Sequence, residues 1–326
     1  MAPSTAADLT RRRNILICAP RVAHMNIFHS LDRYGIQNFE FFHTNDHAAT
    51  NRDRAFLAKV ETMRPSHIIH VPTIMAVPGN ISLETMGGIR RTLGIPIINY
   101  HLDAIKPVWR AMVIHLAQEA DLVILLDGAA PEPYAQRFPR PETKCISLWS
   151  PTPAQYAKTS ADSLQALEKD ISVSFLGTLS GYTDRSEIID HLLANNINVT
   201  VNAPGQYLEA DSYYQILRRS QIVINFSTIQ NWQKYGARPI YQLKGRVFEA
   251  AACHSFLLEQ DNPLTPRYFT PGVEYDSFTD PADALAKIRR YLLDTGTRKA
   301  MAARMHRSFM EKYHPRIFWE RVFAAL

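Results

Sequence analysis

Short apolar runs alternate with amphipathic stretches through the first half of the chain. The apolar runs at 14–20, 39–43, 66–71, 96–100 and 121–126 predict β-strands. Between them, helices are predicted at 51–63, 82–93 and 107–119, and a further one that ends at Gly35. Strands and helices that alternate at this spacing are typical of a doubly wound parallel sheet. Because no Gly-x-Gly-x-x-Gly follows the first run, the pattern does not favour a dinucleotide site there.

The second half repeats this pattern after a break. Proline interrupts residues 149–153, and the strand pattern restarts at Ile171, which indicates a linker between two domains, 1–150 and 151–326. Strands are predicted at 171–177, 199–202, 221–227 and 255–258, and helices at 185–195, 213–220, 246–253, 280–293, 300–313 and 316–326.

The composition narrows the class of protein. With 46% hydrophobic and 21% charged residues, the 326-residue chain matches a globular protein, and no apolar run is long enough for a transmembrane helix. Cys18, Cys145 and Cys253 are scattered in apolar surroundings, which predicts buried thiols and a cytoplasmic location. A net charge of +5 suits an anionic substrate or peripheral contact with an anionic membrane. The basic residues are not clustered along the sequence in the way that nucleic-acid binding requires.

Residues 244–258 carry the most informative chemistry. A glycine lies between two cations, Lys244 and Arg246, and a small-residue helix and an apolar strand follow. Lys and Arg at a helix start suit phosphate groups, and Glu249, predicted in the first helical turn, suits the hydroxyls of a sugar or ribose. The alternative is a capping glutamate beside a solvated turn.

The surroundings of this stretch resemble a known family. Arg-Val-Phe-Glu-Ala-Ala-Ala-Cys at 246–253, Phe-Leu-Leu-Glu at 256–259 and Phe-Thr-Pro-Gly-Val-Glu at 269–274 are similar to the C-terminal half of CgeB-like, spore-protein type glycosyltransferases. The resemblance runs from about Ser172 to the C-terminus and implies a GT-B fold with a family-4-like C-terminal domain. In that α/β fold, two Rossmann-like doubly wound domains face each other across a cleft. The C-terminal domain binds the nucleotide-sugar donor, the N-terminal domain meets the acceptor, and the last helix braces the N-terminal domain.

The resemblance also implies which residues hold the donor. Gly177, Thr178 and Arg185 match a phosphate-binding loop of the family, and a strand that approaches the donor ends near Asn225. Lys244 and Arg246 would then hold the diphosphate, and Glu249 would hold hydroxyls. An ordinary strand–turn–helix junction is the alternative for the loop.

Polar residues that follow strands of the first half are candidates for catalysis. Ligands of such sheets bind beyond the carboxyl ends of the strands, where the sequence places Arg21, His24, His43, Asp46, His101, Asp103 and Asp127. Tyr-His-Leu-Asp at 100–103 is similar to an aromatic-then-Asp pattern of the family, which makes His101 and Asp103 the preferred pair. An inverting enzyme needs a base here for the acceptor hydroxyl, whereas a retaining enzyme would use the pair to position substrates. The alternative is that His101 and Asp103 only cap the next turn or helix.

One departure from the family-4 pattern keeps other functions open. Retaining family-4 enzymes carry two glutamates separated by seven residues; Glu249 matches the second, and Tyr241 stands in place of the first. We therefore expect a glycosyltransferase that moves a sugar from a nucleoside-diphosphate sugar to an acceptor hydroxyl on a glycan, a protein or a small molecule. A non-catalytic nucleotide-sugar or glycan-binding protein and a GT-B-fold epimerase remain alternatives. No metal or cofactor is expected besides the nucleotide sugar itself, because no Asp-x-Asp is present to bridge a diphosphate through a metal ion.

Overall fold

The computed structural model describes residues 13–21, 38–72, 80–157, 167–202 and 208–326. His24 and the helix expected before Gly35 lie outside these residues. The chain forms two compact units: residues 1–149 together with 316–326 form the first unit, and residues 150–315 form the second unit. The three cysteines are free thiols, of which Cys145 is only partly buried.

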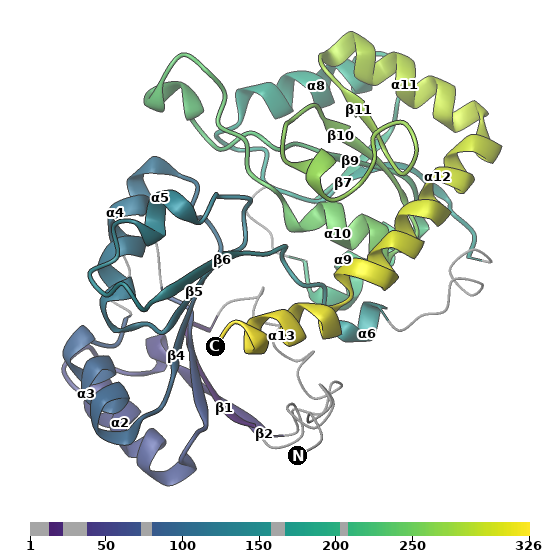
Figure 1. Ribbon diagram of the computed structural model, residues 1–326. Coiled ribbons are helices and arrows are strands. Elements are labelled where there is room, and N and C mark those ends of the chain that lie inside the picture. The colour runs from purple at the N-terminus through teal and green to yellow at the C-terminus, as the bar shows by residue number, and fades with distance from the viewer. Residues whose placement is uncertain (1–12, 22–37, 73–79, 158–166, 203–207) are drawn as a thin grey trace. The chain divides into compact units, whose positions relative to one another are not determined.

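The first unit contains a parallel sheet with the strand order β2-β1-β3-β4-β5-β6 (Figure 1). Its strands are β1 (Asn14–Ala19), β2 (Asn38–His43), β3 (His67–His70), β4 (Ile97–His101), β5 (Leu122–Leu125) and β6 (Lys144–Ser147). The helices that connect them include α2 (Arg52–Met63), α3 (Leu83–Leu93), α4 (Pro107–Leu116) and α5 (Glu132–Ala135). The apolar runs therefore identified the first five strands, but β6 was not predicted.

Alternation along the strands sorts side chains onto the two faces of this sheet. Leu16, Ile68 and Ile97 point to the face that is covered by α2 and α3, where they pack with Phe56 and Ile89. The boundaries of α3 are set locally. The Ser82 hydroxyl accepts a hydrogen bond from the Thr85 amide at its start, and Gly94 adopts the left-handed conformation at its end.

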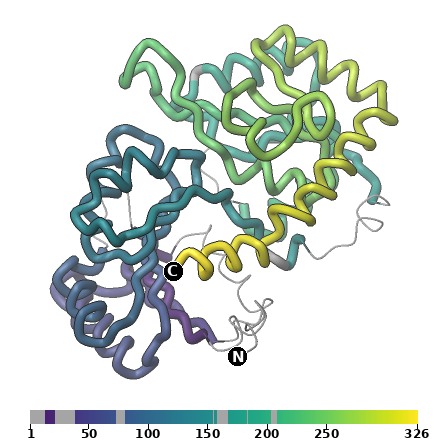
Figure 2. The backbone as a smooth tube through the Cα atoms, viewed as in Figure 1, coloured from purple at the N-terminus to yellow at the C-terminus, as the bar shows by residue number. Residues whose placement is uncertain are grey.

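The last helix, α13 (Pro315–Ala324), packs on the opposite face of the same sheet. Phe318, Trp319 and Val322 are fully buried. The Phe318 ring lies 6.3 Å from that of Tyr100 on β4, and the Phe323 ring lies 5.6 Å from that of His67 on β3. In Figure 2 this yellow C-terminal segment can be followed to its end, where the Leu326 carbonyl accepts a hydrogen bond from Lys144 on β6. Residues from the far end of the sequence thus complete the first unit.

The second unit contains a second parallel sheet, with the order β11-β10-β9-β7-β8. Its strands are β7 (Ile171–Phe175), β8 (Val199–Val201), β9 (Ser220–Asn225), β10 (Phe256–Gln260) and β11 (Asp276–Phe278). Its helices include α8 (Thr183–Ala194), α9 (Ala210–Arg219), α10 (Gly245–Ala252), α11 (Pro281–Leu293) and α12 (Thr295–Ser308). In Figure 1, α8 and α11 cover one face, where Ile188 and Ile288 pack with strand residues, and α9 and α10 lie on the other.

Some element boundaries differ from the expectation. The helix expected at 300–313 begins at Thr295, because the Asp294 side chain accepts a hydrogen bond from the Thr297 amide. It ends in a π-helical turn at Phe309–Tyr313. His101 is the last residue of β4 and does not follow the strand. Among the helices that the structure describes, none is both long and apolar enough to span a membrane.

Candidate functional site

The second unit has a topological switch point between β7 and β9. From β7 the chain passes through α8 to β8 on one side, and it then returns through α9 to β9 on the other side of β7. Neighbouring loops diverge at such a point, so that a crevice forms beyond the carboxyl ends of the two strands, and ligands of open α/β sheets bind there.

Arg246 bridges the two strand ends at the switch point. Its Nη2 donates a hydrogen bond to the carbonyl of Leu176, directly after β7. Its Nη1 donates to Oδ1 of Asn225, the last residue of β9, over 2.6 Å. The guanidinium carbon lies 4.9 Å from the centroid of the Phe175 ring. These two bonds hold the guanidinium in place; its Nε is buried, and the Tyr213 side chain also lies within hydrogen-bonding reach.

Gly177 leaves the space that this guanidinium occupies. A Cβ atom at residue 177 would lie 2.6 Å from Nη2 of Arg246 and 2.9 Å from Cζ of Phe175. Both distances are shorter than van der Waals contact. Glycine at residue 177, two residues after the end of β7, therefore leaves room for the position that Arg246 adopts.

Glu249 lies in the second turn of α10, which corrects the expected position in the first turn. The helix begins one residue earlier than expected, at Gly245, with Lys244 as its N-cap and no acidic residue in the first turn. The capping alternative therefore does not describe Glu249. Its Oε2 accepts a hydrogen bond of 2.5 Å from the Tyr213 hydroxyl on α9. Burial raises the pKa of Glu249, while the bond from Tyr213 and the charge of Arg246 act in the opposite direction.

The loop after β7 is held by Arg185. This buried side chain donates to the carbonyls of Thr178, over 2.9 Å, and Thr228, over 3.2 Å. Its guanidinium carbon lies 3.4 Å from the centroid of the Tyr182 ring. Burial lowers the pKa of Arg185 to about 10. The described contacts of Arg185 are thus those of a residue that supports the loop, whereas Thr178 is exposed.

The structure adds two residues that the sequence analysis did not single out. Tyr213 contacts Glu249 from another helix, and no local pattern signals that pairing. Glu259 lies beside Asn225 in the register of β10 and β9, and Asn225 Nδ2 donates to its Oε2 over 2.7 Å. Burial raises the pKa of Glu259 to about 7. In the sequence, the only signal for Glu259 was that an acidic residue follows directly after the apolar run at 256–258.

His101, the first of the two predicted catalytic residues, is fully buried. It shares a sheet face with Asn99, whose Nδ2 donates to the carbonyl of Leu116 in α4, so the helical layer covers this face. Burial lowers the pKa of His101 to about 3, and the nearby His70 contributes to the same shift. The imidazole is therefore neutral near pH 7.

Asp103, the second predicted catalytic residue, is accessible. Its carboxylate is 37% exposed and forms an ion pair of 3.2 Å with Lys106. Since Lys106 is the N-cap of α4, Asp103 does not cap that helix. The neighbouring Asp127 is buried and accepts hydrogen bonds from the amides of Ile105 and Ala129. Burial raises the pKa of Asp127 to about 7.

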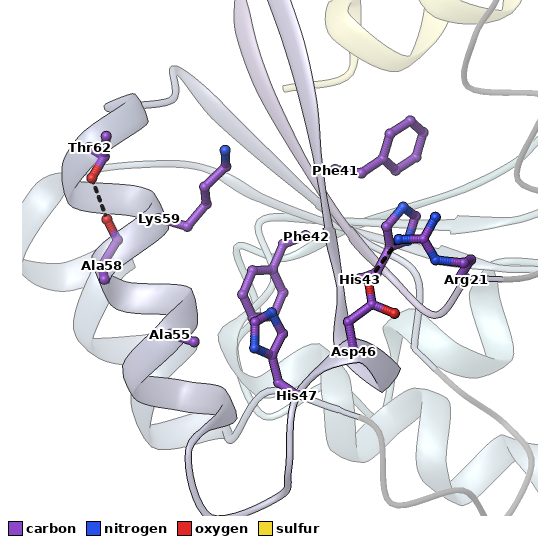
Figure 3. Close-up of a pocket in the computed structure, with 10 residues that line it drawn as sticks. All are labelled: Arg21, Phe41, Phe42, His43, Asp46, His47, Ala55, Ala58, Lys59 and Thr62. Carbon is purple, nitrogen blue, oxygen red and sulfur yellow. Dashed lines mark hydrogen bonds and ion pairs between the residues drawn. The ribbon is translucent and has the colours of Figure 1, made fainter.

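A separate concavity lies between β2 and α2 in the first unit (Figure 3). Arg21 and Asp46 form an ion pair of 2.7 Å at its rim, and the rings of Phe42 and His47 stack within it. Arg21, which follows β1, His43, the last residue of β2, and Asp46, which follows β2, thus gather here. None of the preferred donor or catalytic residues lines this concavity, so it does not contribute to the candidate site.

The structure therefore brings Gly177, Asn225, Arg246 and Glu249 together near the carboxyl ends of β7 and β9 in the second sheet. Thr178, Arg185 and Lys244 flank them, and the Lys244 ammonium donates to Gln242. His101 and Asp103 belong to the first unit. Within the described part of the chain, no three His, Cys, Asp or Glu residues gather where they could hold a metal ion.

Comparison with known proteins decides the family. A profile described as glycosyl transferase-like matches residues 160–323. The chain belongs to this glycosyl transferase-like family. The match includes α10 and the whole switch point of the second unit. No sequence among curated proteins matches the chain.

Solved structures that are similar to this glycosyl transferase-like protein establish its fold. HepE of Anabaena, in complex with UDP and glucose, has 13% sequence identity and a TM-score of 0.62, with 96% of this chain and 98% of HepE covered. Sucrose-phosphate synthase of Thermosynechococcus elongatus has 11% identity and a TM-score of 0.62, with 97% and 100% covered. A glycosyltransferase of Rickettsia africae has 7% identity and a TM-score of 0.58, with 96% and 98% covered. The predicted GT-B fold of two α/β units with parallel sheets is thereby confirmed.

Proposed function

We propose that the protein transfers a sugar from a nucleoside-diphosphate sugar to an acceptor hydroxyl, and that the second unit binds the donor. The observation that carries this proposal is the position of Arg246, which bridges the ends of β7 and β9 at the switch point. A departing nucleoside diphosphate gains negative charge in the transition state, and a cation fixed at this place stabilises it. The CgeB-like character of residues 246–274 is part of the same proposal.

The donor residues take distinct roles in this proposal. Arg246 and Lys244 bind the diphosphate, and Glu249 accepts hydrogen bonds from hydroxyls of the sugar or ribose. The loop at Gly177 and Thr178 offers backbone amides to the phosphates, with Arg185 as its support. These cationic side chains neutralise the leaving group, so no metal ion and no further cofactor is required.

UDP is the first nucleotide to test, since HepE of Anabaena has been solved with UDP and with UDP-glucose.

For the acceptor, we propose Asp103 as the base of an inverting reaction or as a positioning group of a retaining one. Asp103 is preferred over His101 because its carboxylate is accessible whereas the imidazole is enclosed. The acceptor is a glycan, a protein or a small molecule, and we place the reaction in the cytoplasm, with peripheral membrane contact as one setting.

The test is incubation of the protein with UDP-, GDP- and TDP-sugars, each with and without added acceptors and with and without EDTA. Release of the nucleoside diphosphate that depends on the acceptor and survives EDTA supports the proposal. Tight binding without turnover would instead indicate a binding protein, and an isomerised donor would indicate an epimerase. If no nucleotide or nucleotide sugar binds in calorimetry, the assignment of the second unit as the donor domain is wrong.

We predict that Glu249→Ala weakens use of the sugar donor about 30-fold in kcat/KM. Loss of a hydrogen bond to a charged acceptor costs about 2 kcal/mol, and each 1.4 kcal/mol is a factor of about ten. Steady-state kinetics with the best donor of the panel provides the measurement. Glu187→Ala, on the exposed side of α8 in the same unit, is the control and should leave kcat/KM unchanged. Equal kinetics of wild type and Glu249→Ala would remove Glu249 from the site.

We also predict that Gly177→Ala reduces affinity for the nucleoside diphosphate about tenfold and lowers the free energy of unfolding by about 1–3 kcal/mol. The new Cβ displaces the end of the Arg246 side chain, so the diphosphate loses a positioned donor, and it also crowds the buried Phe175 ring. Calorimetry with UDP measures the affinity, and thermal unfolding measures the stability. The control is Gly88→Ala, where no atom lies within 4 Å of the added Cβ. Unchanged nucleotide affinity in Gly177→Ala would contradict the close fit of Gly177 and Arg246.

A further inference from the structure

A series of hydrogen-bonded polar side chains, called the polar chain below, connects Arg246 to the interior of the second unit. From Nη1 of Arg246 it passes to Oδ1 of Asn225 over 2.6 Å, and from Nδ2 of Asn225 to Oε2 of Glu259 over 2.7 Å. Oε1 of Glu259 then accepts from Nδ2 of Asn262 over 3.1 Å. Asn225, Glu259 and Asn262 are all buried. We infer that Glu259 is a positioning residue of the donor site, which orients Asn225, and through it Arg246, only while Glu259 is ionised. This inference rests on the proposed function.

The direction of the hydrogen bonds on the Asn225 side is fixed by chemistry. A guanidinium can only donate, so the oxygen of the Asn225 amide must face Arg246. The amide nitrogen of Asn225 then faces Glu259 and donates to it. Asn225 therefore requires an acceptor at Oε2 of Glu259.

The direction on the Asn262 side is fixed by the backbone. Oδ1 of Asn262 accepts hydrogen bonds of 2.9 Å from the amides of both Leu264 and Thr265. The amide group of Asn262 cannot turn around without losing both bonds, so its nitrogen faces Oε1 of Glu259. Both oxygens of Glu259 thus meet N–H donors that are held in place. Asn262 Nδ2 also lies 2.8 Å from the Gln260 carbonyl and 3.2 Å from Thr265 Oγ1. A carboxylate accepts fully from both Asn225 and Asn262, whereas a protonated acid is a weaker acceptor at the oxygen that carries the hydrogen.

Burial acts against this ionised state. Glu259 is 1% exposed, and burial raises its pKa to about 7. The bond from Asn225 and the charges of Arg246, Lys244 and Arg185 oppose that shift, and the Tyr275 hydroxyl is a further titratable group that faces Glu259. Below pH 7 the acid gains a proton, its hydrogen bonds with the two amide groups weaken, and Arg246 is held less firmly through Asn225. Affinity for the donor is therefore expected to be complete above about pH 8 and to fall as the pH drops through about 7.

Glu259→Gln tests the inference with a neutral side chain of the same shape. An amide offers one oxygen and one N–H₂ group, so one of the two fixed donors meets another donor. We expect KM for the nucleotide sugar to rise about tenfold at pH 8 and kcat to fall as well, since the displaced Arg246 binds the donor and stabilises the leaving diphosphate less well. We also expect the loss of affinity between pH 8 and pH 6, which wild type shows, to disappear. Whichever of UDP-, GDP- and TDP-glucose binds tightest is the probe, because a diphosphate esterified at both ends does not titrate near neutral pH.

Two further variants separate this role from a general effect of altering a buried acid. Glu274→Gln is the matched control: Glu274 is also buried in the second unit, and its oxygens accept from the Thr270 amide and the Ser308 hydroxyl, away from Arg246. It should retain the wild-type KM and pH dependence. Asn225→Asp places a second carboxylate beside Glu259, so the fall in affinity should move to higher pH.

The outcomes distinguish the inference from the proposed function. Wild-type KM and pH dependence in Glu259→Gln would overturn the inference while the proposed function stands. The same loss of affinity in Glu274→Gln would overturn it as well. Failure of wild type to bind any of the three nucleotide sugars would overturn both.

Discussion

Replacement of Arg246 by alanine should lower kcat/KM for the nucleotide sugar more than 100-fold. The guanidinium is held by Leu176 and Asn225 at the switch point of the second sheet, and under the proposed function its remaining N–H groups bind the diphosphate. Hydrogen bonds to charged groups contribute about 1.5–3 kcal/mol each, so losing two of them costs about 3 kcal/mol or more. At about 1.4 kcal/mol per factor of ten, this corresponds to a loss of more than 100-fold. Steady-state kinetics with the best donor of the panel provides the measurement.

Two other arginine variants show whether geometry or charge is responsible. Arg246→Lys keeps the charge but cannot reach the Leu176 carbonyl and Asn225 together, so we expect it to recover only a small part of the activity. Arg219→Ala removes an exposed cation of the same unit, which is paired with Asp170, and it should change kcat/KM less than twofold. Wild-type activity in Arg246→Ala, with a normal unfolding transition, would place the diphosphate elsewhere.

Replacement of Trp319 by alanine should destabilise the first unit by about 3–5 kcal/mol, which is typical of removing a large aromatic side chain from a core. Trp319 on α13 is fully buried, and its ring lies 4.9 Å from that of Phe318 and 6.1 Å from that of Phe323. Domains are stabilised by only about 5–15 kcal/mol, so this loss is a large fraction of the total. Urea unfolding followed by circular dichroism measures the change.

The control for Trp319 is Val108→Ala, which shortens a half-exposed side chain on α4 of the same unit. We expect it to change the free energy of unfolding by less than about 0.5 kcal/mol. If Trp319→Ala unfolds at the urea concentration of wild type, α13 does not contribute to the core of the first unit.

Several features of the fold follow from short stretches of sequence. Apolar runs such as 14–20 and 221–227 predict strands, because a strand covered by helices on both faces buries nearly every side chain. Helix starts such as Asp280, whose side chain accepts from the Asp283 amide, are set within one turn of chain. By contrast, β6 was missed because its burial is incomplete and its apolar pattern is weak.

The sequence by itself determined two sheets of alternating strands and helices, and it marked Gly177, Lys244, Arg246 and Glu249 as candidates for a donor site. Only the tertiary structure decided that Arg246 lies between the ends of β7 and β9, that Glu259 adjoins Asn225, and that Tyr213 contacts Glu249. It also decided that His101 is enclosed whereas Asp103 is accessible, and that α13 completes the core of the first unit. The reason is physical: local patterns reflect hydrogen bonding and burial along a single element. Strand order, register and the contacts of polar side chains depend on residues that are distant in the sequence and meet only when the sheets form.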